Sequence, residues 1–166
     1  MRSFFIIFDR DLDCVVNKSD FVDWVEERAK KYMSKEKAEV FCNLWDKEWD
    51  MFCGGAQKEK ENINEMVKAH QKYLQDPHYH EKTEKWLSAC FDGVDANSDG
   101  MVTMDEYAVF LECFGVHPLS VCPSFEALDA NHDGLISREE FVNAGRDFFQ
   151  HTDDTPAKLF WGPFLA

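Results

Sequence analysis

The sequence contains no stretch suited to binding nucleic acid or to crossing a membrane. Its 18 lysines and arginines stand against 32 aspartates and glutamates, and no basic run is long enough to follow a phosphate backbone. The apolar segment at residues 1–8 is too short to span a bilayer and lacks the small-residue cleavage site of a secretory signal. We therefore expect no nucleic-acid partner, no membrane span and no secretion.

Cysteines with the spacing of a zinc or redox site are also missing. Six cysteines are present, yet no two of them form a C-x-x-C motif. Several fall on apolar helical faces, which favours reduced and mostly buried thiols. Together with the missing secretion signal, this pattern predicts a cytoplasmic protein.

The composition is that of a folded chain with an excess of acid. Of its 166 residues, 45% are hydrophobic and 14% aromatic, enough for one compact domain or two small lobes with a sizeable core. The formal net charge is −14, so three bound divalent cations would change it to −14 + 6 = −8. Excess acid of this kind is what a cation-binding protein shows without its ions.

One twelve-residue run, 95–106, carries oxygen-bearing side chains at alternate positions. A hard cation such as Ca²⁺ takes six to eight oxygen ligands, so a short chain must wrap around it. Gly100 stands at position 6, where the chain turns sharply, and Thr103 at position 9 can hold a water on the metal. The predicted ligands are Asp95, Asn97, Asp99, the backbone carbonyl of Met101, and both oxygens of Glu106.

The same pattern returns at residues 129–140. A single run of this kind also fits a polar turn between helices, but two runs that begin 34 residues apart (129 − 95) indicate a repeated calcium-binding loop. Gly134 again stands at position 6 and Ser137 at position 9. The predicted ligands are Asp129, Asn131, Asp133, the backbone carbonyl of Leu135, and Glu140.

A third run, 9–20, follows the pattern less closely. Asp9, Asp11, Asp13 and Asp20 occupy positions 1, 3, 5 and 12, but Cys14 replaces the turn glycine and Asp20 replaces the closing glutamate. If Cys14 adopts a positive φ, it costs on the order of 1 kcal/mol. The shorter Asp20 side chain favours six ligands over seven, so Mg²⁺ should compete better here. The alternative is an empty, degenerate loop.

A calcium-binding loop needs a partner, and the segment around residues 56–67 offers one without ligands. Aligning Ile63 with Val16 at position 8 places Lys58 and Lys60 at positions 3 and 5, with Ala56 at 1 and Val67 at 12. Lysine donates hydrogen bonds only and cannot bind a cation. We expect a silent second hand whose Ile63 pairs with Val16, as Val102 should pair with Ile136 in a two-residue antiparallel ribbon.

Hydrophobic periodicity places helices around these loops. It predicts helices at 21–33, 34–53, 63–75 and 82–94, and an exit helix after the loop 95–106 that runs to residue 114. Ser34 is the expected N-cap of the helix at 34–53, and residues 54–55 are its expected stop. Another helix opens at Ser137 with a capping box to Glu140. The predicted fold is all-α, with four helix-loop-helix hands as an N-terminal pair (1–76), a C-terminal pair (77–153) and an apolar tail (154–166). A polar connector at 76–80 joins the two lobes.

The tail is too apolar to be left in water, since it carries Leu159, Phe160, Trp161, Phe164 and Leu165. We expect it to pack into a groove between the lobes, and the alternative is a motif that binds a partner protein. If it fills the groove that a target helix would need, the protein should buffer calcium without opening.

Three ligand-bearing hands in the order first, third and fourth, a silent second hand and the Leu-Phe-Trp-Gly-Pro-Phe-Leu tail resemble the invertebrate sarcoplasmic calcium-binding proteins of the EF-hand superfamily. The resemblance implies a compact cytosolic buffer of calcium and magnesium, with no enzyme activity. Carried over by position, it also implies a metal-binding carbonyl at Val15 in the first loop. We expect a monomer whose partners are divalent ions.

Related folds leave two other functions open. Calexcitin-like proteins are calcium sensors or signalling adaptors, and the coelenterazine-binding proteins and calcium-triggered photoproteins hold an organic ligand. The photoproteins are oxygenases, and their cavity is sealed by a C-terminal proline. This chain ends in Leu165 and Ala166, which speaks against that last function.

Overall fold

The described parts of the chain form a compact bundle of short helices. In the computed structural model these parts are residues 2–53, 58–150 and 154–163. They contain α1 (Arg2–Ile6), β1 (Val15–Asn17), the π-helical turn η1 (Ser19–Asp23), α2 (Trp24–Tyr32), α3 (Lys35–Cys53), β2 (Lys60–Asn62), α4 (Ile63–Tyr73), α5 (Tyr79–Val94), β3 (Met101–Val102), α6 (Met104–Cys113), the 3₁₀ turn η2 (Pro118–Ser120), α7 (Val121–Leu128), β4 (Ile136–Ser137), α8 (Arg138–Gln150) and the 3₁₀ turn η3 (Pro156–Leu159). The all-α EF-hand prediction is confirmed.

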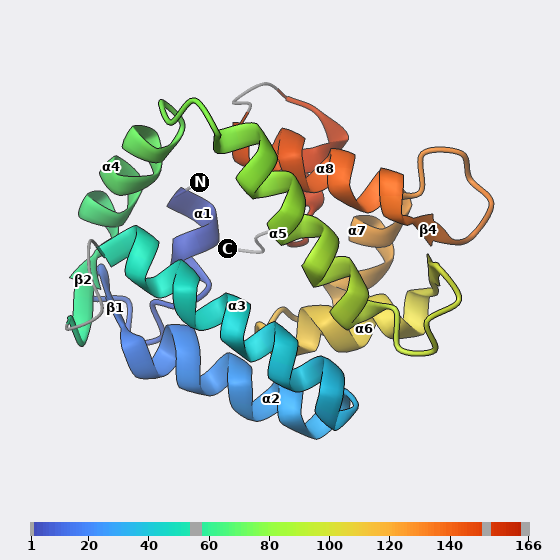
Figure 1. Ribbon diagram of the computed structural model, residues 1–166, viewed down its shortest axis with the longest axis horizontal. Coiled ribbons are helices and arrows are strands. Elements are labelled where there is room, and N and C mark those ends of the chain that lie inside the picture. Colours follow the sequence, from blue (N-terminus) through green and yellow to red (C-terminus); the bar gives the residue numbers. More distant parts are fainter. Residues whose placement is uncertain (1, 54–57, 151–153, 164–166) are drawn as a thin grey trace.

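The two longest helices run through the middle of the molecule and join its halves. Figure 1 shows α3 next to α5, with α2 and α4 on the side of α3 and α6, α7 and α8 on the side of α5. Ser34 caps α3 as predicted, because its Oγ accepts a hydrogen bond from the Lys37 backbone N–H at 3.3 Å. The predicted stop at residues 54–55 lies outside the described residues. No helix among the described residues has the length and apolar character of a membrane span.

One helix begins earlier than expected. The connector predicted at residues 76–80 is shorter, because α5 starts at Tyr79. The side chain of Tyr79 is buried, and its ring centroid lies 5.0 Å from that of Tyr73 on α4. This aromatic contact between consecutive helices favours a tight turn over an extended polar linker.

Each pair of loops is joined by a short antiparallel ribbon, and one of the two predicted registers is wrong. Val102 pairs with Ile136, as the sequence predicted. In the other ribbon Val16 pairs with Glu61 and not with Ile63. Ile63 is buried at the start of α4, which Asn62 caps by accepting from the Asn64 N–H at 2.8 Å. Its apolar character therefore serves the core and not the ribbon.

This register moves the second hand by two residues along the chain. With Glu61 at position 8, position 5 is Lys58 and position 12 is Glu65, so the predicted placements of Ala56, Lys58, Lys60 and Val67 are wrong. Position 1 becomes residue 54 and position 3 residue 56, both outside the described residues. Glycine and alanine at those positions and the lysine at position 5 carry no side-chain oxygen, so in the revised alignment Glu65 at position 12 is the one acidic residue among positions 1, 3, 5 and 12 of this hand.

A single aromatic core extends across both halves of the molecule. Phe4 of α1 packs between them, with its ring centroid 6.3 Å from that of Trp45 and 5.1 Å from that of Trp161. Trp161 in turn lies 4.6 Å from Phe114, centroid to centroid. Phe160 and Trp161 of the tail are both buried, whereas Phe164 and Leu165 lie outside the described residues. The tail thus forms part of the core that holds the halves together.

Candidate metal centre

The loop at residues 95–106 begins where α5 ends, and its own backbone orients the first carboxylate. Asp95 is only 3% exposed. Its Oδ1 accepts from the Asp99 N–H at 3.2 Å and its Oδ2 from the Gly100 N–H at 2.9 Å. Gly100 has φ +87°, a conformation that glycine adopts without steric cost. A buried carboxylate held in this way is oriented before any ion arrives.

Glu106 ties the two ends of the same loop together. One carboxylate oxygen accepts from the Ala96 N–H at 3.0 Å, near the start of the loop. The other accepts from the backbone N–H of Thr103 at 2.9 Å and from its hydroxyl at 2.8 Å, which forms a capping box at the start of α6. The closing glutamate therefore already lies across the loop from Asp95.

The loop at residues 129–140 repeats these interactions. Asp129 accepts from the N–H groups of Asp133 (3.1 Å) and Gly134 (2.9 Å). Glu140 accepts from the Ala130 N–H at 3.1 Å and the Ser137 N–H at 2.8 Å. The predicted capping box at Ser137 is also present, since the Glu140 N–H donates to the Ser137 Oγ at 3.3 Å. The two loops are therefore built as copies.

The remaining side-chain ligands predicted for these loops are fixed by short turns. The side-chain oxygen of Asn97 accepts from the Asp99 N–H at 2.9 Å, and Asp99 accepts from the Met101 N–H at 2.9 Å. In the other loop Asn131 accepts from the Asp133 N–H and Asp133 from the Leu135 N–H, at 2.8 and 2.9 Å. Asx turns of this type fix both side chain and backbone over two residues.

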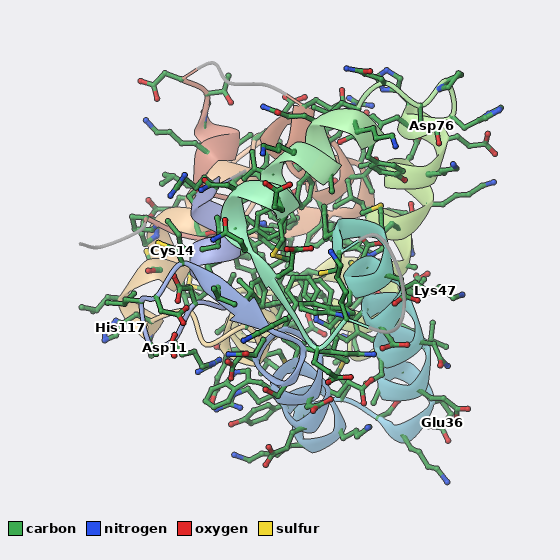
Figure 2. All side chains as sticks on the ribbon, turned by 90° about the vertical axis from the view of Figure 1, so that its left-hand side faces the viewer. Asp11, Cys14, Glu36, Lys47, Asp76 and His117 are labelled. Atoms are coloured by element: carbon green, nitrogen blue, oxygen red, sulfur yellow. The ribbon has the colours of Figure 1, made fainter. Side chains whose placement is uncertain are left out.

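The first loop begins in the same way. Asp9 is 5% exposed, and its two oxygens accept from the N–H groups of Asp13 (3.1 Å) and Cys14 (3.0 Å). Asp13 accepts from the Val15 N–H at 2.8 Å. Carboxylate oxygens of Asp9, Asp11 and Asp13 all lie within 4.8 Å of one another. Figure 2 shows Asp11 and Cys14 at the edge of the molecule, where solvent and ions reach them.

All three loops share a backbone turn that the sequence pattern did not reveal in full. Cys14 has φ +68°, as predicted for position 6, matching Gly100 (+87°) and Gly134 (+83°). Position 4 is also left-handed in every loop, with positive φ at Leu12 (61°), Ser98 (62°) and His132 (59°). Non-glycine residues rarely adopt this conformation. Its recurrence at position 4 means that the first loop has the same backbone path as the other two.

The first loop closes differently. Among the described residues no backbone N–H donates to the carboxylate of Asp20, which instead receives a 3.3 Å hydrogen bond from the Asn17 side-chain amide. Asp20 lies in the π-helical turn η1, whereas Glu106 and Glu140 open regular α-helices. Its Oδ1 also lies 3.8 Å from the Arg10 Nε. A cationic side chain at position 2 therefore faces the closing ligand.

Arg10 is the residue near this loop that sequence reasoning missed. Its guanidinium carbon lies 3.2 Å from the ring centroid of Trp24, and Arg28 stacks on the same ring at 3.2 Å. Burial lowers the pKa of Arg10, while the nearby Asp20 opposes that shift. The only sequence signal was an arginine between two acidic ligands, and it did not reveal the tryptophan that holds it.

The second hand presents a cation where the other hands present oxygens. Lys58, at position 5 in the observed register, forms an ion pair with Glu61 of β2. Glu65 at position 12 pairs with Lys68 at 2.6 Å and is exposed. An ammonium group at position 5 repels a divalent ion. The chemistry of the donors thus fits a hard divalent cation in loops 9–20, 95–106 and 129–140, and does not fit one in the second hand.

Comparisons with known proteins agree with this geometry. A sequence model described as EF hand matches residues 87–111 and 124–143. The sarcoplasmic calcium-binding proteins of Perinereis vancaurica tetradentata and Hediste diversicolor are 38% and 37% identical to this chain, each covering 99% of it and 96% of the relative. The calcium-loaded apo form of the coelenterazine-binding protein from Renilla muelleri has a TM-score of 0.73 and 25% identity, covering 98% of this chain and 93% of that one. The chain therefore belongs to the sarcoplasmic calcium-binding protein family.

Proposed function

We propose that this protein is a cytoplasmic calcium buffer that binds three divalent ions, with Mg²⁺ competing in the first loop. The observation that carries the proposal is that all three loops hold their first aspartate through two backbone N–H bonds around a left-handed turn. An oriented, acidic oxygen cage binds a hard cation with little reorganisation. The proposed ligands are Asp9, Asp11, Asp13, Val15 and Asp20; Asp95, Asn97, Asp99, Met101 and Glu106; and Asp129, Asn131, Asp133, Leu135 and Glu140.

Burial of the tail supports a buffer over a sensor. A sensor hand opens on binding calcium and offers an apolar groove to a target helix. Here the Tyr107 hydroxyl donates to the Phe160 carbonyl at 2.6 Å, and the Ser124 hydroxyl donates to the Leu159 carbonyl at 2.6 Å. Phe160 and Trp161 are at most 1% exposed. A target helix would have to displace these contacts, so we infer that no protein target binds at this groove.

The size of the aromatic pocket lined by Trp45, Glu48, His70 and Trp86 argues against a luciferin-type ligand inside the aromatic core. Its volume is about 30 Å³, whereas pockets for organic ligands of drug size measure roughly 300–1,000 Å³. A large chromophore would require the aromatic core around it to separate. These dimensions leave no room for a large organic ligand inside the aromatic core.

Metal titration tests the proposal directly. Native mass spectrometry should count three calcium ions on the wild-type chain, and calorimetry with and without millimolar magnesium should show competition in one class of site. Asp20→Glu, which lengthens the closing side chain, should shift the competing site towards calcium. If the wild-type chain and Asp9→Asn both bind two calcium ions, the first loop does not bind calcium and the proposal of three sites is wrong.

The sensor alternative has a separate test. An apolar reporter dye should bind the calcium-loaded and magnesium-loaded forms to the same small extent, because Phe160 and Trp161 fill the groove in both. A calcium-specific gain in dye binding, together with protease cleavage near Leu159, would favour the sensor.

A further inference from the structure

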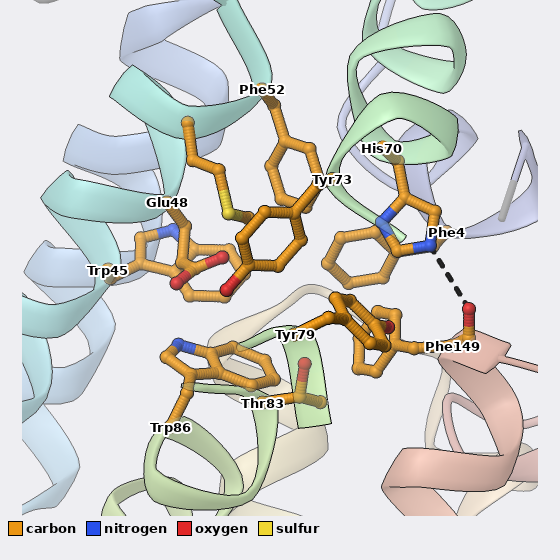
Figure 3. Close-up of a pocket in the computed structure, with 11 residues that line it drawn as sticks. Phe4, Trp45, Glu48, Phe52, His70, Tyr73, Tyr79, Thr83, Trp86 and Phe149 are labelled. Atoms are coloured by element: carbon orange, nitrogen blue, oxygen red, sulfur yellow. Dashed lines mark hydrogen bonds between the residues drawn. The ribbon is translucent and has the colours of Figure 1, made fainter. Parts of the chain in front are cut away.

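The small pocket between the two halves has polar groups that the calcium sites do not use. Residues from α1, α3, α4, α5 and α8 line it, so both pairs of hands contribute. Figure 3 shows Glu48 at one end and His70 at the other, with the aromatic rings of Trp45, Tyr73 and Trp86 between and beside them. The volume of about 30 Å³ admits a slender molecule of a few heavy atoms, or one or two waters.

His70 offers an acceptor at one end of this pocket. Its side chain is 4% exposed, and its Nε2 lies 3.0 Å from the Phe149 carbonyl oxygen, drawn as the dashed line in Figure 3. A carbonyl only accepts, so Nε2 carries the proton. Burial lowers the pKa of His70, which keeps the ring neutral. Its Nδ1 is then a buried acceptor, and no described residue donates to it.

Glu48 brings a half-buried acid to the other end. No described residue forms a hydrogen bond or ion pair with its carboxylate, and burial raises its pKa to about 8. The rings of Trp45 and Trp86 stack beside it with centroids 6.3 Å apart. The buried indole N–H of Trp86 also has no partner among the described residues. An unpaired carboxylate among aromatic faces is the chemistry that recognises an organic ammonium ion.

We propose that this pocket binds a small amino alcohol, with its ammonium group on Glu48 beside the rings of Trp45 and Trp86 and its hydroxyl donating to the Nδ1 of His70. Such a molecule supplies a cation for the unpaired acid and a donor for the unpaired imidazole nitrogen. Its few heavy atoms also match the size of the pocket. The site lies outside all three metal loops and is independent of the buffer function.

The pH dependence follows from the groups that face Glu48. Burial raises the pKa of Tyr73 to about 12 and also raises the pKa of Tyr79 and of the Cys90 thiol, so these groups stay neutral near pH 8. His70 is neutral there because its pKa is lowered. The ligand requires ionised Glu48, so its binding should strengthen up to about tenfold per pH unit from pH 6 to 8 and level off above.

Nuclear magnetic resonance of the calcium-saturated protein tests the site with ethanolamine as the probe. The indole N–H signal of Trp86, assigned by Trp86→Phe, should shift and saturate in the roughly millimolar range expected for so small a ligand. The indole signal of Trp24, which lies in the first hand, should not move. Ethylammonium, which lacks the hydroxyl, should bind more weakly, and ethylene glycol, which lacks the charge, should not bind.

Variants identify the acid. Glu48→Gln should weaken ethanolamine binding at least about tenfold, while Glu39→Gln, an exposed acid on the same helix, should have no effect. Both variants should bind calcium like the wild type, which separates failure of this site from failure of the buffer. No saturable shift of the wild-type Trp86 signal at any pH, or equal binding of ethylene glycol, would overturn the proposal and leave ordered water as the occupant. The pH profile of the wild type decides the question even if Glu48→Gln does not fold.

Discussion

The first loop and the two C-terminal loops begin alike and close differently. In each, the first aspartate accepts from two loop N–H groups and positions 4 and 6 are left-handed. Glu106 and Glu140 then cap a helix and accept backbone N–H bonds, whereas Asp20 meets Arg10 and a side-chain amide. The orientation of the first ligand is therefore set by the backbone turn of the loop. Closure is set by the length of one side chain and by its neighbours.

A second comparison concerns the two pairs of hands. Each pair of hands has its own two-stranded ribbon, but the hydrophobic cores of the two pairs are continuous through the contact between Phe4 and Trp161. The tail therefore makes the stability of one half depend on the other.

Trp161→Ala should have the largest effect, a loss of about 3–5 kcal/mol in the free energy of unfolding. Trp161 is 1% exposed and packs on Phe4 of the first half and Phe110 of the second, with centroids 5.1 and 5.4 Å away. Thermal unfolding in saturating calcium should show one transition at a lower temperature. Leu119→Ala, at a side chain 72% exposed, is the control. Two transitions, of which the substitution lowers only the one that belongs to the C-terminal half, would mean that the halves unfold independently.

Glu140→Gln should reduce the calcium affinity of its loop by about 100-fold or more, because it removes a charged ligand and weakens the bonds that join the loop ends. Asp20→Asn should reduce the affinity of the first loop less, since fewer bonds hold Asp20. Calorimetric titration of both variants gives the two changes side by side. Equal losses would show that the closing residue plays the same part in both loops.

Arg10→Gln should raise the divalent-ion affinity of the first loop about two- to fivefold, because it removes a partly exposed cation that competes for Asp20. The gain should shrink as ionic strength rises. Arg28→Gln, on the same tryptophan ring but without an ion pair to Asp20, is the matched control. A lower affinity in Arg10→Gln would instead make the arginine a support for the loop.

Cys14→Gly should have a comparably small effect, a gain of about 0.5–1 kcal/mol in stability. Relief of the left-handed conformation at φ +68° favours glycine, while its greater freedom in the unfolded chain removes part of the gain. Chemical denaturation of the calcium-loaded protein measures the difference. Gly134→Cys, the reverse change in the last loop, should lose a similar amount.

Much of the site could be predicted because it is local. A calcium loop is twelve consecutive residues, so the spacing of Asp95, Asp99 and Glu106 in the sequence fixes their spacing around an ion. The positive φ at Cys14 followed from the same local turn. The predicted helix over 34–53 and its Ser34 cap also depend on neighbours in the sequence and were confirmed.

Errors arose where distant segments meet. The pairing of Val16 with Glu61 depends on where α4 begins and on whether Ile63 is buried in the core. A strand of three residues is too short for its alternation of polar and apolar residues to decide either point. The early start of α5 likewise depends on Tyr79 packing against α4. In both cases a side chain was assigned a local role, Ile63 in the ribbon and Tyr79 in a polar connector, whereas in the structure it packs in the core.

The sequence by itself determined the class of the fold, the three oxygen-bearing loops and the lack of acidic residues at positions 1, 3 and 5 of the second hand, because these depend on residue type and on spacing within a few turns of chain. Only the tertiary structure decided the ribbon register, the Arg10–Asp20 contact, the tail as a bridge between halves and the pocket at Glu48. Each of these brings together residues from different elements. Their chemistry depends on distances, burial and partners that follow from packing of the whole chain.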